Sequence, residues 1–261
     1  MDIDQQTTPE PESEPGPEPV GQTPLLERLT NVILSPGQVF GGIRGVPADP
    51  INWAVPLVIS FLAGILYSIT VFSQAGVLES TRLQQEEQFE KEVEAGRMTA
   101  RDAEEMQGSV ERFLTPKFMM LFGIAGVIFG TPIIWLVSAF LFHWVVRLAS
   151  HSHIPFSKCF EVIGLSSLVS VMGVLVNMLL VVVTQNLAMT LSLALAFEEF
   201  DPTNRTHALA AEIDVTRVWY LAVIAVAWSR LTRQPVATCG AWIFGLWVSF
   251  RVSSILLFVS G

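Results

Sequence analysis

The sequence predicts an all-α polytopic membrane protein with five transmembrane helices, a cytoplasmic N-terminus and a C-terminus outside. Of its 261 residues, 51% are hydrophobic and only 15% are charged, whereas a soluble domain carries about 25% charge. The mean hydropathy is +0.51. Long uncharged apolar runs also recur along the chain, and about 20 such residues in a helix cross a bilayer. These observations exclude a soluble enzyme, a disordered chain and a disulfide scaffold, and the formal net charge of −9 argues against a nucleic-acid partner.

The N-terminal part of the chain divides into two segments before the membrane domain at 51–261. Residues 1–24 are rich in acids and prolines, so they cannot bury enough apolar surface to fold, and we expect them to be disordered. Residues 25–50 form an interfacial amphipathic segment. In its first part, LLERLTNVIL, the apolar residues fall on one helical face, and the helix is expected to end at Ser35-Pro36.

Five apolar stretches are predicted to cross the bilayer. Two of them involve charged residues. Arg217 and Arg230 flank the fourth stretch and are expected to extend toward the two interfaces, and Arg251 interrupts the fifth. A further apolar segment at 187–197 is predicted to lie at the interface or to continue the third helix. The five stretches are 54–72, 118–146, 162–184, 218–229 and 235–259.

The distribution of basic residues gives the expected orientation. The short connections that follow the second and fourth stretches are basic, as is the N-terminal flank, while the other two connections are rich in acids. Short basic loops stay in the cytoplasm, so the N-terminus is predicted to be inside. The first acidic connection contains a patterned segment at 79–114, where apolar residues recur at helical spacing. Thr99 followed by Asp102 is typical of a helix start, and a charged helical hairpin is predicted there.

The ionisable residues do not form a recognisable catalytic or metal-binding set, so we expect no catalytic residues, no metal and no cofactor. A pair of charges inside the membrane is nevertheless predicted near the outer face. Asp214 and Arg217 begin the fourth stretch at the depth where the fifth ends, so Asp214 is expected to pair with Arg251, with Arg217 turned toward the lipid headgroups. The alternative is that Arg251 reaches the interface alone. The alternative to the absence of a metal is a site built from the residues of ligand type around one short loop, namely His143, His151, His153 and Cys159.

The order of these features resembles the Ypt-interacting-protein (Yip) domain family. Four segments carry the resemblance, which covers about residues 25–260. One residue departs from the family pattern: Thr216 stands where the family usually has an aromatic residue. The four segments are Ser35-Pro36-Gly37-Gln38-Val39-Phe40, GRMTARDAEEM (96–106), PFSKCFEVIGLSSL (155–168) and Asp214-x-x-x-x-Trp219.

The resemblance implies a location and a partner class but no chemistry. Eukaryotic members are Golgi and endoplasmic-reticulum proteins linked to Rab-type GTPases, whereas prokaryotic members lack that partner. The acidic connection and the Pro/Glu-rich tail favour a prokaryotic member, hence a bacterial cytoplasmic (inner) membrane. The family brings no catalytic residues. The candidates for structural or interaction roles, from these motifs and from the charge pair predicted above, are Ser35, Pro36, Phe40, Asp214, Arg217, Trp219 and Arg251.

Two functions remain open at this point. The first is a non-enzymatic membrane scaffold or adaptor that acts through helix packing and its cytoplasmic face, as a homo-oligomer or with another membrane protein. The second is a component for transport of lipids or small neutral solutes, with the long third stretch and 187–197 lining a path. The lack of acids and lysines in the first three stretches weakens an ion-coupled mechanism.

Overall fold

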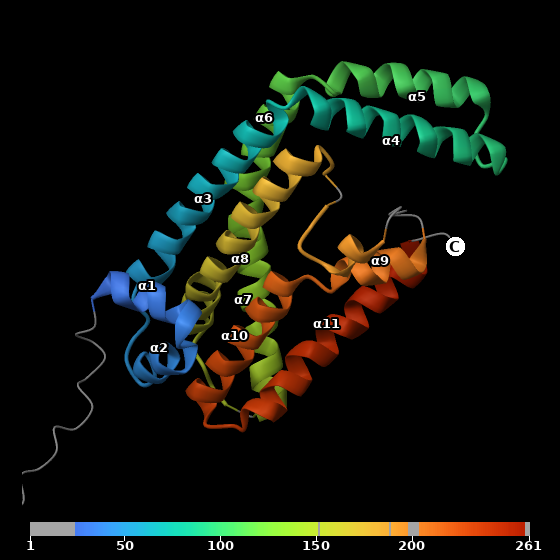
Figure 1. Ribbon diagram of the computed structural model, residues 1–261. Coiled ribbons are helices and arrows are strands. Elements are labelled where there is room, and N and C mark those ends of the chain that lie inside the picture. Colours follow the sequence, from blue (N-terminus) through green and yellow to red (C-terminus); the bar gives the residue numbers. More distant parts are fainter. Residues whose placement is uncertain (1–23, 151, 188, 198–203, 259–261) are drawn as a thin grey trace, which may run out of the picture.

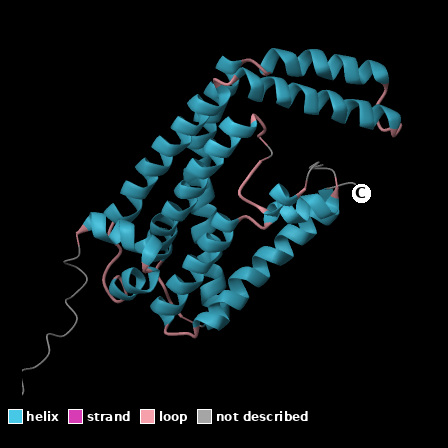
Figure 2. Ribbon diagram, viewed as in Figure 1, coloured by secondary structure: helices cyan, strands magenta, loops and turns pink. Residues whose placement is uncertain are grey.

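The computed structural model describes residues 24–150, 152–187, 189–197 and 204–258. All regular secondary structure in these ranges is helical, apart from one isolated β-bridge between Ser192 and Asp214 (Figures 1 and 2). The expected disorder of 1–24 falls outside the described residues except for Pro24. The α-helices are α1 (Leu25–Leu34), α2 (Pro36–Gly42), α3 (Ile51–Phe72), α4 (Ala75–Glu94), α5 (Ala100–Phe113), α6 (Pro116–Ala125), α7 (Thr131–Ser150), α8 (Phe156–Thr184), α9 (Arg205–Glu212), α10 (Val215–Thr232) and α11 (Val236–Phe258).

Four helices among the described residues are long and apolar enough to cross a membrane: Ile51–Phe72, Pro116–Ser150, Phe156–Thr184 and Val236–Leu257. The all-α membrane architecture is therefore confirmed. The predicted fourth stretch forms α10, which is not among the four. Its 18 residues include both Arg217 and Arg230, and these two charges lower the mean hydropathy of the helix.

The second of these four helices contains a wider turn. A π-helical segment, Gly126–Gly130 (η2), joins α6 to α7. Pro132 stands two residues after its end, and a proline ring inside an α-helix clashes with the carbonyl one turn earlier. One extra residue in the turn relieves that clash without ending the helix.

The centre of the bundle is α8, which contacts α1, α3, α7 and α10. It begins at Phe156, six residues before the predicted start of the third stretch, and it ends at Thr184, where the next residue, Gln185, has a left-handed backbone conformation (φ 55°). The prediction that 187–197 is helical was wrong for most of its described residues, since only Leu193–Ala196 (η3) form a 3₁₀ turn. The left-handed residue reverses the chain, so the segment turns back along α8 instead of continuing it.

The amphipathic segment is folded onto the bundle. Val32 of α1 and Phe40 of α2 are fully buried in the main hydrophobic core, where α1 contacts α8 and α2 contacts α10. Leu26 and Leu34 of α1 remain mostly exposed, so one part of the apolar face packs inward and another part is left for lipid.

A helical arm projects from the opposite end of the bundle. Helices α4 and α5 lie side by side beyond the ends of α3 and α6 (Figure 1), and they correspond to the hairpin expected at 79–114. Thr99 caps α5 and accepts a hydrogen bond from the backbone N–H of Asp102. Ser80 donates to the backbone oxygen of Gln185 (2.5 Å), which ties the base of the arm to the end of α8.

Candidate functional sites: buried polar groups and the helical arm

The residues of the Ser-Pro motif build the junction between α1 and α2. Ser35 ends α1 and precedes α2, and Pro36 is the first residue of α2, a position where its missing N–H costs nothing. The turn directs Phe40 into the core. Gly37 lies against Arg230, because a Cβ at this glycine would stand 3.1 Å from a guanidinium nitrogen. The motif therefore docks the N-terminal segment on α10.

Asp214 caps the beginning of α10. Its carboxylate accepts hydrogen bonds from the hydroxyl of Thr216 (2.5 Å) and from the backbone N–H of Arg217 (2.9 Å). The side chain is 5% exposed, and the positive end of the helix dipole stabilises its charge. Asp214 is thus a helix cap, and Trp219, one turn further on, packs partly buried against the main core.

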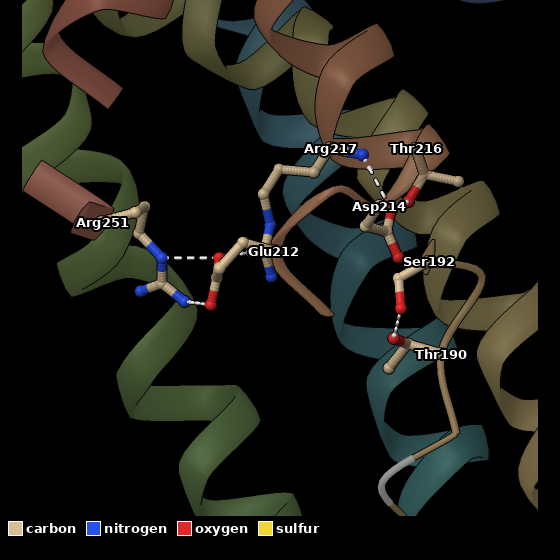
Figure 3. Close-up of polar contacts among 7 residues, drawn as sticks. All are labelled: Thr190, Ser192, Glu212, Asp214, Thr216, Arg217 and Arg251. Atoms are coloured by element: carbon tan, nitrogen blue, oxygen red, sulfur yellow. Dashed lines mark hydrogen bonds and ion pairs between the residues drawn. The ribbon is translucent and has the colours of Figure 1, made fainter. Parts of the chain in front are cut away.

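The predicted pair between Asp214 and Arg251 was wrong. Arg251 makes a two-pronged contact with Glu212, in which its Nε lies 2.6 Å from Oε2 and its Nη2 contacts Oε1 (Figure 3). Arg217 also contacts Glu212 instead of turning to lipid headgroups. Glu212 ends α9 two residues before the cap, which places its carboxylate beside α11 while Asp214 turns back into its own helix.

The beginning of α10, next to this charged cluster, lies part-way along α8 and not beside its C-terminal end. Gly173 faces Thr216, since a Cβ at 173 would come 2.5 Å from the threonine hydroxyl. That glycine is eleven residues before Thr184, which corresponds to about 16 Å along a helix. The small Thr216, at the position where an aromatic residue is usual, therefore packs where only a glycine leaves room.

The returning segment satisfies its backbone in this region. Leu191 N–H donates to the side chain of Asn177 on α8 (3.2 Å), Leu193 N–H donates to the oxygen of Ile213, and Val215 N–H donates to the oxygen of Leu191. Irregular backbone is tolerated at membrane depth only where its polar groups are bonded or covered by protein. These bonds tie 191–193 to the beginning of α10 at 213–215 and to α8.

Sequence reasoning missed a second buried polar cluster, at the beginning of α8. Glu161 is fully buried and accepts a hydrogen bond from the amide of Asn52 on α3 (2.6 Å). Its other oxygen lies 2.5 Å from Nζ of Lys158, and that ammonium group also donates to the backbone oxygen of Pro47 (3.2 Å). Lysine and glutamate three residues apart share one helical face, and this spacing was the available signal.

The arm carries a groove between its two helices, with a volume of about 500 Å³. Its apolar lining comes from Phe89, Val93, Ala100 and Ala103, and four carboxylates line it as well. At the tip of the arm, a hydrogen bond from Arg97 lowers the pKa of Glu92. The four acidic lining residues are Glu86, Glu90, Glu94 and Glu104.

The described residues contain no group of three or more His, Cys, Asp or Glu side chains placed to hold a metal ion. Cys159 lies 3.8 Å from the ring of His143, and both belong to the packed helices α8 and α7. His151 is outside the described residues. Glu161 joins α8 to α3 through Asn52, and Glu212 joins α9 to α11 through Arg251, so these buried polar contacts fix helices relative to each other.

The profile of the Yip1 domain matches residues 30–259. The chain belongs to the Yip1 domain family. No curated protein and no solved structure gave a match. The matched range of the Yip1 domain runs from α1 to the end of α11 and includes the arm, so the Ser-Pro junction, both buried polar clusters and the groove are all parts of this domain.

Proposed function

We propose that this protein is a non-enzymatic membrane scaffold or adaptor that binds a partner protein through its α4–α5 arm. The observation that carries the proposal is the groove of the arm, with its apolar lining and four glutamates. An amphipathic helix with an apolar face and basic flanks matches such a surface in shape and charge. The partner is therefore expected to present a basic amphipathic segment.

The packing of the arm supports this proposal. Val77, at its base, is the only buried residue of α4, and no described side chain of α5 is buried. Leu83 and Met106 are about half exposed. Two short helices without a shared core gain little stability from each other. A partner that covers these apolar side chains would supply the buried apolar surface that the arm lacks.

The topology that we propose has five spans, with α10 as the fourth, an N-terminus in the cytoplasm and a C-terminus outside. The α7–α8 and α10–α11 connections lie at the same end of the bundle as α1 and α2 (Figure 1). Arg147, Arg230 and Arg233 lie in or next to these connections, and short basic connections stay in the cytoplasm. The arm then faces outward from a bacterial cytoplasmic membrane. A Rab-type GTPase is a partner only in a eukaryotic source, and the lipid-facing helices offer a surface for self-association.

The topology is tested by cysteine labelling in intact cells with a membrane-impermeant maleimide. The native Cys159 and Cys239 are buried, so reaction is expected only at an introduced exposed thiol. Gln88→Cys on the arm should react from outside, and Ser152→Cys should react only after the membrane is opened. The opposite pattern overturns the topology without affecting the partner proposal.

The partner proposal is tested with a photo-crosslinking amino acid at Val93 in the full-length protein. Irradiation of cells is expected to give one defined adduct, which the double variant Glu90→Lys/Glu94→Lys reduces strongly. Glu87→Lys is the matched control, because Glu87 does not line the groove and pairs with Lys91. No adduct, or equal adducts in all three proteins, contradicts the adaptor proposal, and an adduct with a second copy of the chain identifies self-association.

The alternative function is a component for transport of lipids or neutral solutes. A cavity within the helix bundle favours it, because hydroxyl-bearing side chains line that cavity at membrane depth. The cavity gives a place for a ligand to bind, whereas transport also needs a path across the bilayer, so the adaptor proposal is preferred.

A further inference from the structure

A cavity of about 300 Å³ lies among α3, the η2–α7 region, α8 and α10, within the membrane-spanning part of the bundle. Its lining side chains are apolar except for the indole of Trp135 and a set of hydroxyl groups contributed by all of these helices. Those groups belong to Ser60, Thr131, Ser138, Ser167, Ser170 and Tyr220.

The hydroxyls differ in whether the protein satisfies them. Ser60 and Ser167 each donate to a carbonyl of their own helix, at 2.8 and 2.6 Å. Within the described part of the chain, the hydroxyls of the remaining four have no hydrogen-bond partner. Serine and threonine can rotate onto a backbone carbonyl of their own helix.

Tyr220 has no such alternative. Its phenol group stands at the far end of a rigid ring, beyond reach of the carbonyls of α10. Tyrosine hydroxyls that are removed from water usually find a partner, and the hydrocarbon around this helix offers none. The half-buried Tyr220 therefore presents an unpaired donor to the cavity.

The depth and the charge of the cavity restrict its ligand. Ser170 is fourteen residues from the start of α8 at Phe156, or about 21 Å along a helix, which is near the middle of its 29 residues. None of the lining residues is ionisable at neutral pH. A charged group at this depth without a counter-charge is costly, so a charged headgroup does not suit the cavity.

The cavity opens toward the lipid. Ser170 and Ile134 both line it and are exposed on the surface of the bundle, which is where acyl chains lie. One wall is fixed, since a Cβ at Gly64 would stand 2.7 Å from both γ-methyl groups of Val127 in the π turn. The volume is at the small end of the range for ligand pockets, so it fits a compact polar group whose tail stays in the bilayer.

We propose that this cavity binds an uncharged lipid that carries carbonyl or ester oxygens, with Tyr220 donating a hydrogen bond to one of them. The shared chemistry is an acceptor oxygen on a neutral molecule that resides in the hydrocarbon layer. Diacylglycerols and isoprenoid-type quinones are two sources of that chemistry. The inference does not depend on the partner proposed for the arm.

The test uses the full-length protein in lipid nanodiscs with a diacylglycerol whose acyl chain carries a photoreactive diazirine. A phosphatidylglycerol with the same modified chain is the charged counterpart. After irradiation, mass spectrometry of the peptides should show preferential labelling by the neutral probe on segments that contain Ser138, Ser170 or Tyr220. Competition by decyl-benzoquinone identifies the quinone as the preferred source, and its failure to compete identifies the diacylglycerol.

Two matched variants separate binding from folding. Tyr220→Phe removes only the hydroxyl, and labelling of the cavity peptides is expected to fall about fivefold, as for one lost hydrogen bond. Tyr67→Phe, at the other tyrosine of the chain, should leave it unchanged. Both proteins should keep the melting temperature of the parent. Equal labelling by the two lipid probes, or equal labelling of the two tyrosine variants, overturns the proposal.

Discussion

Replacing Glu161 with glutamine tests whether the polar cluster at the start of α8 holds the bundle together. The carboxylate is fully buried, with Asn52 bound to one oxygen and Lys158 against the other. Glutamine keeps an oxygen for Asn52 but loses its negative charge. The ammonium group of Lys158 then stays buried with only the backbone oxygen of Pro47 as a partner.

The expected cost follows from this geometry. Removing one partner of a buried ion pair costs about 3–5 kcal/mol, and the retained hydrogen bond places Glu161→Gln near the lower end, at about 3 kcal/mol. In a double-mutant cycle with Lys158→Gln, the double variant should be less destabilised than the sum of the single variants by about 2 kcal/mol. The neutral pair leaves no unbalanced charge inside the protein.

The measurement is reversible unfolding of the full-length protein in mixed micelles, followed by tryptophan fluorescence. Glu87→Gln is the control, because its ion pair with Lys91 is exposed and such pairs are worth less than about 1 kcal/mol. The reasoning is refuted if Glu161→Gln costs no more than this control, or if the effects of Glu161→Gln and Lys158→Gln add without coupling.

Two further predictions concern helix contacts. Gly164→Ala should destabilise the protein by about 1–3 kcal/mol, because the new methyl would stand 2.5 Å from Cβ of Trp53 and 2.7 Å from its Cα. In the same unfolding assay Gly245→Ala should be neutral or stabilising, because nothing outside its own stretch of helix would lie within 4 Å of the new methyl. Equal effects of the two variants would argue against the close approach. Glu212→Gln and Arg251→Gln should show a coupling of about 1 kcal/mol or more in a thermal double-mutant cycle, and purely additive melting shifts would show that the pair is absent.

Local patterns predicted the long apolar helices and several helix ends. The first stretch was expected at 54–72 and forms α3 at Ile51–Phe72, because a run of apolar residues in a membrane has no alternative to helix. Thr99 was expected to begin a helix and caps α5, since a cap depends only on the residues next to it. Both features are set within one or two turns of chain.

The errors arose where contacts between distant segments decide the outcome. The third stretch was expected to begin at 162, and the structure places Lys158 and Glu161 inside α8, where Asn52 of α3 binds the glutamate. The partner of Arg251 was misassigned because α10 was expected to begin at the membrane surface. Because the chain turns back after Gln185, α10 begins part-way along α8, and Glu212 comes to lie beside Arg251.

The composition of α10 has a consequence for how the protein enters its membrane. Arginines near both ends make this helix a poor substrate for insertion by itself, yet its centre is buried, with Val223 and Trp228 almost inaccessible. A turn of three residues, 233–235, separates it from the apolar α11, and the two helices pack together. In the five-span topology proposed above, the pair partitions into the bilayer as one hairpin, so α11 determines whether α10 stays in the membrane.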